Sequence, residues 1–165
     1  MTLNKMKRLL FLAFAIIAGF GCSQAQTTPN TIAPYKIMTT KDQTATAADL
    51  PKNKPVILIY FAPDCPHCQK LIRDMKPDMD KFKKFEIVMI TFTDIRMVKT
   101  FESDYGLTKY PNFILGTEGY TYTVQRYYQL KHTPYVAIYG KNGKLLKAFE
   151  NQPEVKDILA VTSKV

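Results

Sequence analysis

Apolar residues along the chain follow two spacings, which separate the expected strands from the expected helices. Pro55–Phe61 and Phe85–Thr93 are near-continuous apolar runs rich in branched residues, and such runs predict strands buried on both faces. Apolar residues recur at helical spacing over Leu71–Phe82, and Pro77 is expected to kink or restart that helix. A second helical stripe predicts a helix over Asp94–Tyr105.

The remaining apolar segments are shorter and complete the expected fold class. Asn142-Gly143 between two apolar runs indicates a hairpin with a two-residue turn. Strands that alternate with helices, followed by a hairpin and a closing helix, predict an α/β sandwich. The other expected elements are a short edge strand at Tyr35–Thr40, strands at Asn112–Leu115, Pro134–Tyr139 and Lys144–Phe149, a helix at Thr121–Leu130, and a last helix opened by Pro153.

Residues 1–25 have the pattern of an export signal. Three basic residues stand near the start, and Leu9–Phe20 is an unbroken stretch of twelve apolar or glycine residues. A membrane-spanning helix needs about 20 apolar residues, so this stretch fits the core of a signal peptide better. We therefore expect the protein to be exported.

Two ways of processing this leader are compatible with the sequence. Gly19-Phe20-Gly21-Cys22 looks like a lipoprotein signal, in which Cys22 becomes the lipidated first residue, although Leu is usual where Gly19 stands. Ser23-Gln24-Ala25 instead has the small-x-small pattern of ordinary cleavage, which would leave a soluble protein. Either route places the protein in the periplasm, free or anchored to a membrane that faces it.

Length and composition narrow the classes of function. With 46% hydrophobic and 22% charged residues among 165, the chain is not mainly disordered, and three cysteines are too few for a disulfide-stapled miniprotein. Without the leader's three basic residues, 20 Lys and Arg face 14 Asp and Glu, a net charge of +6. No stripe of basic and aromatic residues indicates nucleic acid as a partner. Polar residues 26–34 are interpreted as a tether, and residues 35–165 as one domain.

Two cysteines, Cys65 and Cys68, remain once Cys22 is removed or acylated. A disulfide between residues so close closes almost no loop and would add little stability, so reactivity is the better reason for the pair. Cys65 stands at the expected helix start, where unpaired N–H groups and the helix dipole lower a thiol pKa from about 8.5 to between 3.5 and 7.5. Pro66 suits the first turn of a helix, and His67 can add positive charge or a hydrogen bond to the thiolate.

Other uses of the cysteine pair fit the sequence less well. A zinc site would need a second pair of ligands, and His132 is the only other histidine. Attachment of a c-type haem would need a histidine directly after Cys68, where Gln69 stands. A purely structural disulfide, and capture of copper by the two thiols with His132, stay open as alternatives. The chemistry we expect needs no metal and no bound cofactor.

The motif Phe61-Ala-Pro-Asp-Cys-Pro-His-Cys68 at a strand-to-helix turn, with Thr133-Pro134 opening a later strand, resembles the thioredoxin superfamily. The resemblance covers roughly residues 35–165 and implies the thioredoxin fold, a central mixed sheet flanked by helices. It also implies that Pro134 is cis and packs beside the cysteines. The backbone of Thr133 would then pair with the client chain.

The frame of the chain and the dipeptide between the cysteines resemble different subfamilies. The 66 residues from Cys68 to Pro134 leave room for strand, helix, strand and helix, one helix-strand unit more than plain thioredoxin has. With the export signal, that frame looks like the exported TlpA/ResA-like thiol-disulfide oxidoreductases, and it implies a reductase recharged by a membrane partner. Pro66-His67 instead looks like the DsbA-like dithiol oxidases. The frame spans the chain, so we give it more weight.

The expected activity is that of a cell-envelope thiol-disulfide oxidoreductase that acts on protein thiols and disulfides, with a lean toward reduction. Cys65 attacks and Cys68 resolves the mixed disulfide. The alternatives are a dithiol oxidase and a redox-inactive envelope lipoprotein that uses the fold for binding. Ile59 stands where many relatives have a buried acid, so the proton of Cys68 would pass through water, Asp64 or His67. Asp64 itself is interpreted as a solvated cap of the helix.

Overall fold

A single mixed sheet of seven strands runs through the computed structural model, which describes residues 29–165. The leader and Cys22 lie outside the described residues. The strand order is β2-β1-β5-β4-β3-β6-β7, in which β3, β4 and β5 pair in parallel and all other neighbours are antiparallel. The strands are β1 (Lys36–Thr39), β2 (Thr44–Thr46), β3 (Val56–Tyr60), β4 (Glu86–Thr91), β5 (Phe113–Thr117), β6 (Tyr135–Tyr139) and β7 (Leu145–Glu150).

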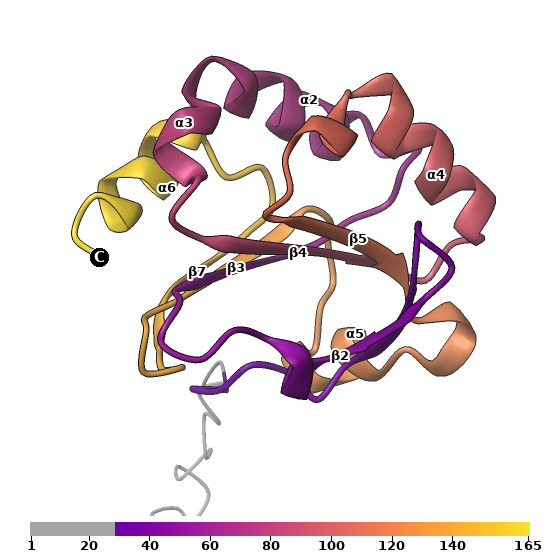
Figure 1. The fold of residues 1–165 in the computed structure, drawn as a ribbon, viewed down its shortest axis with the longest axis horizontal. Coiled ribbons are helices and arrows are strands. Elements are labelled where there is room, and N and C mark those ends of the chain that lie inside the picture. The colour runs from indigo at the N-terminus through magenta and orange to yellow at the C-terminus, as the bar shows by residue number, and fades with distance from the viewer. Residues whose placement is uncertain (1–28) are drawn as a thin grey trace, which may run out of the picture.

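Helices cover both faces of this sheet, as the α/β prediction requires (Figure 1). Four helices lie on one face and α5 lies on the other. Between α2 and β6 the chain forms β4, α4, β5 and α5, which confirms the expected extra helix-strand unit. The helices are α2 (Pro66–Met75), α3 (Met79–Phe82), α4 (Ile95–Asp104), α5 (Thr123–Tyr128) and α6 (Val155–Thr162), and short 3-10 turns occur at Ala47–Asp49, Lys76–Asp78, Leu107–Lys109 and Gly119–Thr121.

The central strand β3 divides the core into two apolar clusters. Every residue of β3 is buried, because successive side chains point to opposite faces and both faces are covered. Ile57 and Ile59 pack with α2, α3, α4 and α6, whereas Leu58 and Tyr60 pack with α5 and β1. The prediction of a strand buried on both faces is confirmed, and β3 ends beside the cysteines.

Local signals at Pro77, Asp94 and Gly106 mark where helices start and stop, whereas the prediction that Pro153 opens the last helix is wrong, because α6 begins at Val155 with Glu154 as its N-cap. Pro77 lies in the 3-10 turn that separates α2 from α3, because its missing N–H cannot continue the helical ladder. Asp94 caps α4, since its Oδ1 accepts a hydrogen bond from the N–H of Arg96 at 2.8 Å. Gly106 follows this helix with a left-handed backbone, φ 62°.

The two-residue turn predicted at Asn142-Gly143 is wrong. Such a turn needs a positive φ at its first residue in type II′, or at both residues in type I′, and only the second residue, Gly143, has one, at 72°. Gly140 N–H donates to the carbonyl of Lys144, and Gly143 N–H donates to that of Gly140, both at 2.9 Å. The hairpin therefore has a three-residue loop, Lys141–Gly143, in which glycine takes the left-handed position.

The N-terminal part of the domain is more ordered than its composition indicates. The expected edge strand is β1, but it lies between β2 and β5, so the prediction that it forms the edge is wrong. Residues 30–34, interpreted as tether, pack on the domain: Ala33 is fully buried, and its N–H donates to the hydroxyl of Tyr128 at 2.8 Å. The N–H of Leu145 likewise donates to the carbonyl of Asn30.

Candidate functional site

The two cysteines lie where β3 passes into α2. Cys65 is the N-cap residue of α2, with an extended backbone, and Pro66 is the first helical residue. The N–H of Cys65 donates to the carbonyl of Ala62 at 3.1 Å, which closes the turn between strand and helix. Because Cys65 itself takes the cap position, the interpretation of Asp64 as the cap is wrong. Asp64 is exposed and precedes the cap.

The two thiols have different surroundings, and both are free. Cys65 is partly exposed, whereas Cys68, one turn later, is 1% exposed and belongs to the apolar core beneath α2. Ile59 lies in the same core and is equally buried, so the strand position that carries an acid in many relatives offers Cys68 no carboxylate.

These surroundings shift the two thiol pKa values in opposite directions. Partial burial would raise the pKa of Cys65, but hydrogen bonds from the Thr133 side chain, from Cys68 and from the backbone N–H of His67 outweigh it, so the pKa falls below its ordinary value. Burial raises the pKa of Cys68 to about 12, and the hydrogen bond to Cys65 adds to the rise. Cys65 is therefore the thiol suited to attack, and Cys68 stays protonated until it is needed.

His67 contributes to this asymmetry through its backbone. It is exposed on α2, and its N–H is among the groups that lower the pKa of Cys65. Unpaired N–H groups at a helix start stabilise a thiolate in this way. A contribution of charge or a hydrogen bond from the His67 ring stays a prediction.

The loop before β6 lies beside Cys65. The peptide bond between Thr133 and Pro134 is cis, as the resemblance implies, and Pro134 is buried. The sulfur of Cys65 donates to the carbonyl oxygen of Thr133 at 3.7 Å. The structure thus brings together the two cysteines and this dipeptide, which are more than 60 residues apart along the chain.

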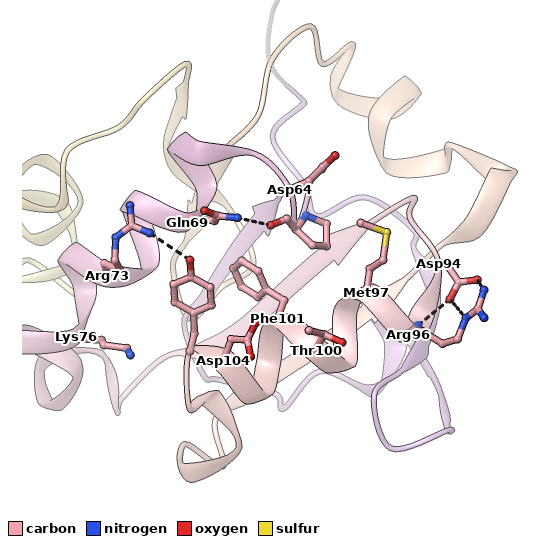
Figure 2. A pocket seen from close by; sticks show the side chains of 12 residues that line it. Asp64, Gln69, Arg73, Lys76, Asp94, Arg96, Met97, Thr100, Phe101 and Asp104 are labelled. Carbon is pink, nitrogen blue, oxygen red and sulfur yellow. Dashed lines mark hydrogen bonds and ion pairs between the residues drawn. The ribbon is translucent and has the colours of Figure 1, made fainter.

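A groove between α2 and α4 reaches Asp64, the residue before Cys65 (Figure 2). Gln69 borders it and donates from Nε2 to the carbonyl of Pro63 at 2.9 Å, which braces the turn. Farther along, Arg73 donates to the hydroxyl of Tyr105 at 3.2 Å, and the side chain of Met97 is 41% exposed.

Between residues 29 and 165, no group of three or more His, Cys, Asp or Glu side chains could hold a metal ion.

Sequence reasoning missed two carboxylates near the site. Glu118 is buried after β5 and accepts hydrogen bonds from the hydroxyl of Tyr60 and the N–H of Val124, both at 2.9 Å, so it fixes the start of α5. Glu150 ends β7 and accepts hydrogen bonds from the loop before Pro134. Glu150 has no local signal, because its partners lie 18 and 19 residues earlier, and Glu118 bonds to Tyr60, which lies 58 residues earlier.

The family follows from a match over most of the chain. A model for the thioredoxin-like domain matches residues 42–162, which include both cysteines and Thr133-Pro134. The chain belongs to this family. The thioredoxin-fold prediction is thereby confirmed, and no curated protein matches the sequence.

Solved structures share the fold at low sequence identity. A secreted Mycobacterium tuberculosis disulfide oxidoreductase homologous to E. coli DsbE has a TM-score of 0.67 and 18% identity, with 80% of this chain and 96% of that chain covered. The peroxidoxin BcpB of Mycobacterium tuberculosis has a TM-score of 0.69 and 15% identity, with 85% of this chain and 98% of that chain covered. A putative protein disulfide isomerase from Bacteroides thetaiotaomicron has a TM-score of 0.67 and 19% identity, with 85% of this chain and 88% of that chain covered. Because the fold serves different chemistries, the function has to be argued from the site.

Proposed function

We propose that this protein is a cell-envelope thiol-disulfide oxidoreductase that reduces disulfides in protein clients. The observation that carries the proposal is the geometry of the two free thiols. Cys65 is partly exposed at the start of α2, with its sulfur 3.7 Å from the carbonyl oxygen of Thr133, whereas Cys68 lies buried one turn later. The opposite shifts of the two pKa values, lowered at Cys65 and raised at Cys68, agree with this arrangement. Membership of the thioredoxin-like family supports the same class of reaction.

In the proposed reaction the thiolate of Cys65 attacks one sulfur of a client disulfide. A mixed disulfide forms, and the first client sulfur leaves as a thiolate and takes a proton from solvent. Cys68 then gives up its proton and attacks the sulfur of Cys65, which forms the Cys65–Cys68 disulfide and releases the second client thiol. The client gains two electrons and two protons, and the protein is oxidised.

An exposed stretch of backbone would hold the client during this exchange. Thr133 forms no backbone–backbone hydrogen bond with other residues in the range 29–165, and its carbonyl lies 3.7 Å from the attacking sulfur. An extended client segment could pair there, as a strand added to a sheet edge does. Pro134 contributes no N–H, so pairing is confined to Thr133.

We favour reduction over oxidation because of the arrangement of elements along the chain. The extra unit formed by α4 and β5 resembles the frame of the exported reductases, whereas the oxidase-like feature is limited to Pro66 and His67.

Location in the envelope rests on residues 1–25, with lipidation at Cys22 or simple cleavage as the two routes. The disulfide oxidoreductase homologous to DsbE is itself described as secreted. None of the helices in the described part of the chain is long and apolar enough to cross a membrane.

A trapping experiment tests the proposal and its direction. Cys68→Ser should accumulate mixed disulfides with clients in cells, whereas Cys65→Ser should trap none. The wild-type pair should be found reduced in cells, with a reduction potential near about −270 mV. A reduction potential of about −120 mV, with the cysteine pair found oxidised in cells, would mean that the protein oxidises its clients instead. A disulfide that dithiothreitol cannot reduce in the folded protein would favour a binding module instead.

A further inference from the structure

One carboxylate holds the loop that precedes β6. Glu150 is the last residue of β7 and pairs with Tyr135, the second residue after Thr133. Its Oε1 accepts hydrogen bonds from two successive backbone N–H groups, those of Lys131 at 3.0 Å and His132 at 3.4 Å. A charged acceptor strengthens such bonds, and a shared oxygen fixes the two peptide units relative to each other.

We propose that Glu150 is a positioning residue that presents the backbone of Thr133 to the client. The inference rests on the proposed function and names a residue outside the cysteine motif on which client binding depends. Glu150 touches neither cysteine. It acts through Thr133, whose carbonyl lies 3.7 Å from the Cys65 sulfur.

An inventory of the loop's N–H groups supports this role. Leu130 N–H donates to the carbonyl of Gln125 at 2.9 Å, those of Lys131 and His132 donate to Glu150, and Pro134 has none. Among residues 29–165, the N–H of Thr133 is thus the one donor of the loop that forms no hydrogen bond to a backbone carbonyl or to Glu150. Without Glu150, three successive donors would be open, and a client strand could pair in more than one register.

The register of the last two strands places Glu150 beside the loop. Glu150 pairs with Tyr135, the first residue of β6, so it stands at the end of the sheet where the loop enters β6. The chain turns sharply as soon as β7 ends, because Asn151 and Gln152 both have left-handed backbones, φ 61° and 63°.

The test compares Glu150→Ala with Asp80→Ala, which removes an exposed carboxylate paired with Lys83 on α3. In Glu150→Ala the amide protons of Lys131 and His132 should exchange with solvent about tenfold faster, because each loses a hydrogen bond to a charged acceptor. Insulin reduction should fall about tenfold in kcat/KM, mainly through KM, as expected for loss of about 1.4 kcal/mol of binding. Reduction of hydroxyethyl disulfide, which has no backbone to pair, should change less than about twofold.

Two further variants keep the test decisive. Glu150→Gln retains an acceptor oxygen and should recover most of the insulin activity. Glu150→Thr suits a strand and is too short to reach both N–H groups, so it replaces the alanine variant should that variant unfold. Asp80→Ala should match the wild type in every assay.

The results separate two failures. The positioning role is overturned if Glu150→Ala loses activity equally toward insulin and hydroxyethyl disulfide, or loses activity toward neither. It is also overturned if the amide exchange rates of Lys131 and His132 do not change. A wild-type protein that reduces neither insulin nor hydroxyethyl disulfide would overturn the proposed function itself.

Discussion

The two faces of the sheet differ in the polar groups that they bury. On the cysteine face, covered by α2, α3, α4 and α6, aliphatic, aromatic and sulfur-containing side chains surround Cys68, and the buried side chains of Asn112 and Thr162 donate to nearby backbone carbonyls. On the tyrosine face, covered by α5 and residues 30–37, buried tyrosines contribute hydroxyl groups to the interior.

The hydroxyls of the tyrosine face form long-range contacts that organise the chain. Tyr128 and Tyr139 share a hydrogen bond of 2.6 Å, and Tyr128 also accepts from the N–H of Ala33. Tyr60 donates to Glu118. The two faces therefore differ in role. Hydroxyl groups fix the N-terminal segment and α5 on one face, whereas burial in the apolar cluster on the other raises the pKa of Cys68.

The largest effect is expected on the cysteine face, where the chemistry lies. Cys65→Ser should lower insulin reduction to the uncatalysed rate, because the attacking sulfur is gone. Cys68→Ser should also stop turnover but should still form the mixed disulfide once. Turnover that survives in Cys65→Ser would contradict the assignment, and Tyr128→Phe on the opposite face serves as a control that should keep its activity.

The tyrosine face should respond in stability rather than in activity. Tyr128→Phe leaves the N–H of Ala33 and the hydroxyl of Tyr139 with one partner fewer, so the free energy of unfolding should fall by about 1–3 kcal/mol. Tyr135 offers a matched control, since its ring lies 5.0 Å from that of Tyr128 and its buried hydroxyl has no hydrogen-bond partner among the described residues. Tyr135→Phe should therefore be neutral or stabilising. Equal losses in the two variants, measured by urea unfolding, would refute this account.

A smaller effect is expected in the pH dependence of the reduced protein. Cys68 has a raised folded-state pKa of about 12, so its burial stabilises the protein fully below the unfolded pKa, near 8.5–9, and progressively less above it. Between pH 9 and 10 the reduced wild type should lose about 1 kcal/mol more than Cys68→Ser. Equal slopes in urea titrations of the two proteins would show that Cys68 is not buried as described. The lowered pKa of Cys65 acts in the opposite sense and is common to both.

The smallest expected effect compares the starts of two helices on the cysteine face. Asp94 caps α4 through a side-chain hydrogen bond, so Asp94→Ala should lower the melting temperature. Asp64 precedes the cap of α2, so Asp64→Ala should lower the melting temperature less. Thermal unfolding of both variants checks the order, which would be reversed if Asp64 were the cap.

The sequence was informative wherever a feature depends on neighbouring residues. The strand before Cys65, the helix after it, the interruption at Pro77 and the stop at Gly106 each follow from a few adjacent side chains, and the structure confirms them. The motif around the cysteines is equally local, so the site could be located before its geometry was known.

Features that depend on distant partners could not be predicted in this way. Residues 30–34 are polar enough to suggest a tether, yet Ala33 is buried because a tyrosine 95 residues away accepts its N–H. Glu150 has an unremarkable position in the sequence, and its partners lie 18 and 19 residues earlier. The loop of the last hairpin also differs from its prediction, because Asn142 does not take the left-handed backbone that the two-residue turn requires.

The most direct test of the central claim is the ultraviolet absorbance of the thiolate in the reduced protein, followed from pH 5 to pH 9. We predict that one thiolate forms with a midpoint below the ordinary thiol pKa of about 8.5, that Cys68→Ser retains it, and that Cys65→Ser lacks it. Cys68 should contribute nothing over this range. Two thiols that titrate together near about 8.5 would contradict the division between an attacking and a protected cysteine.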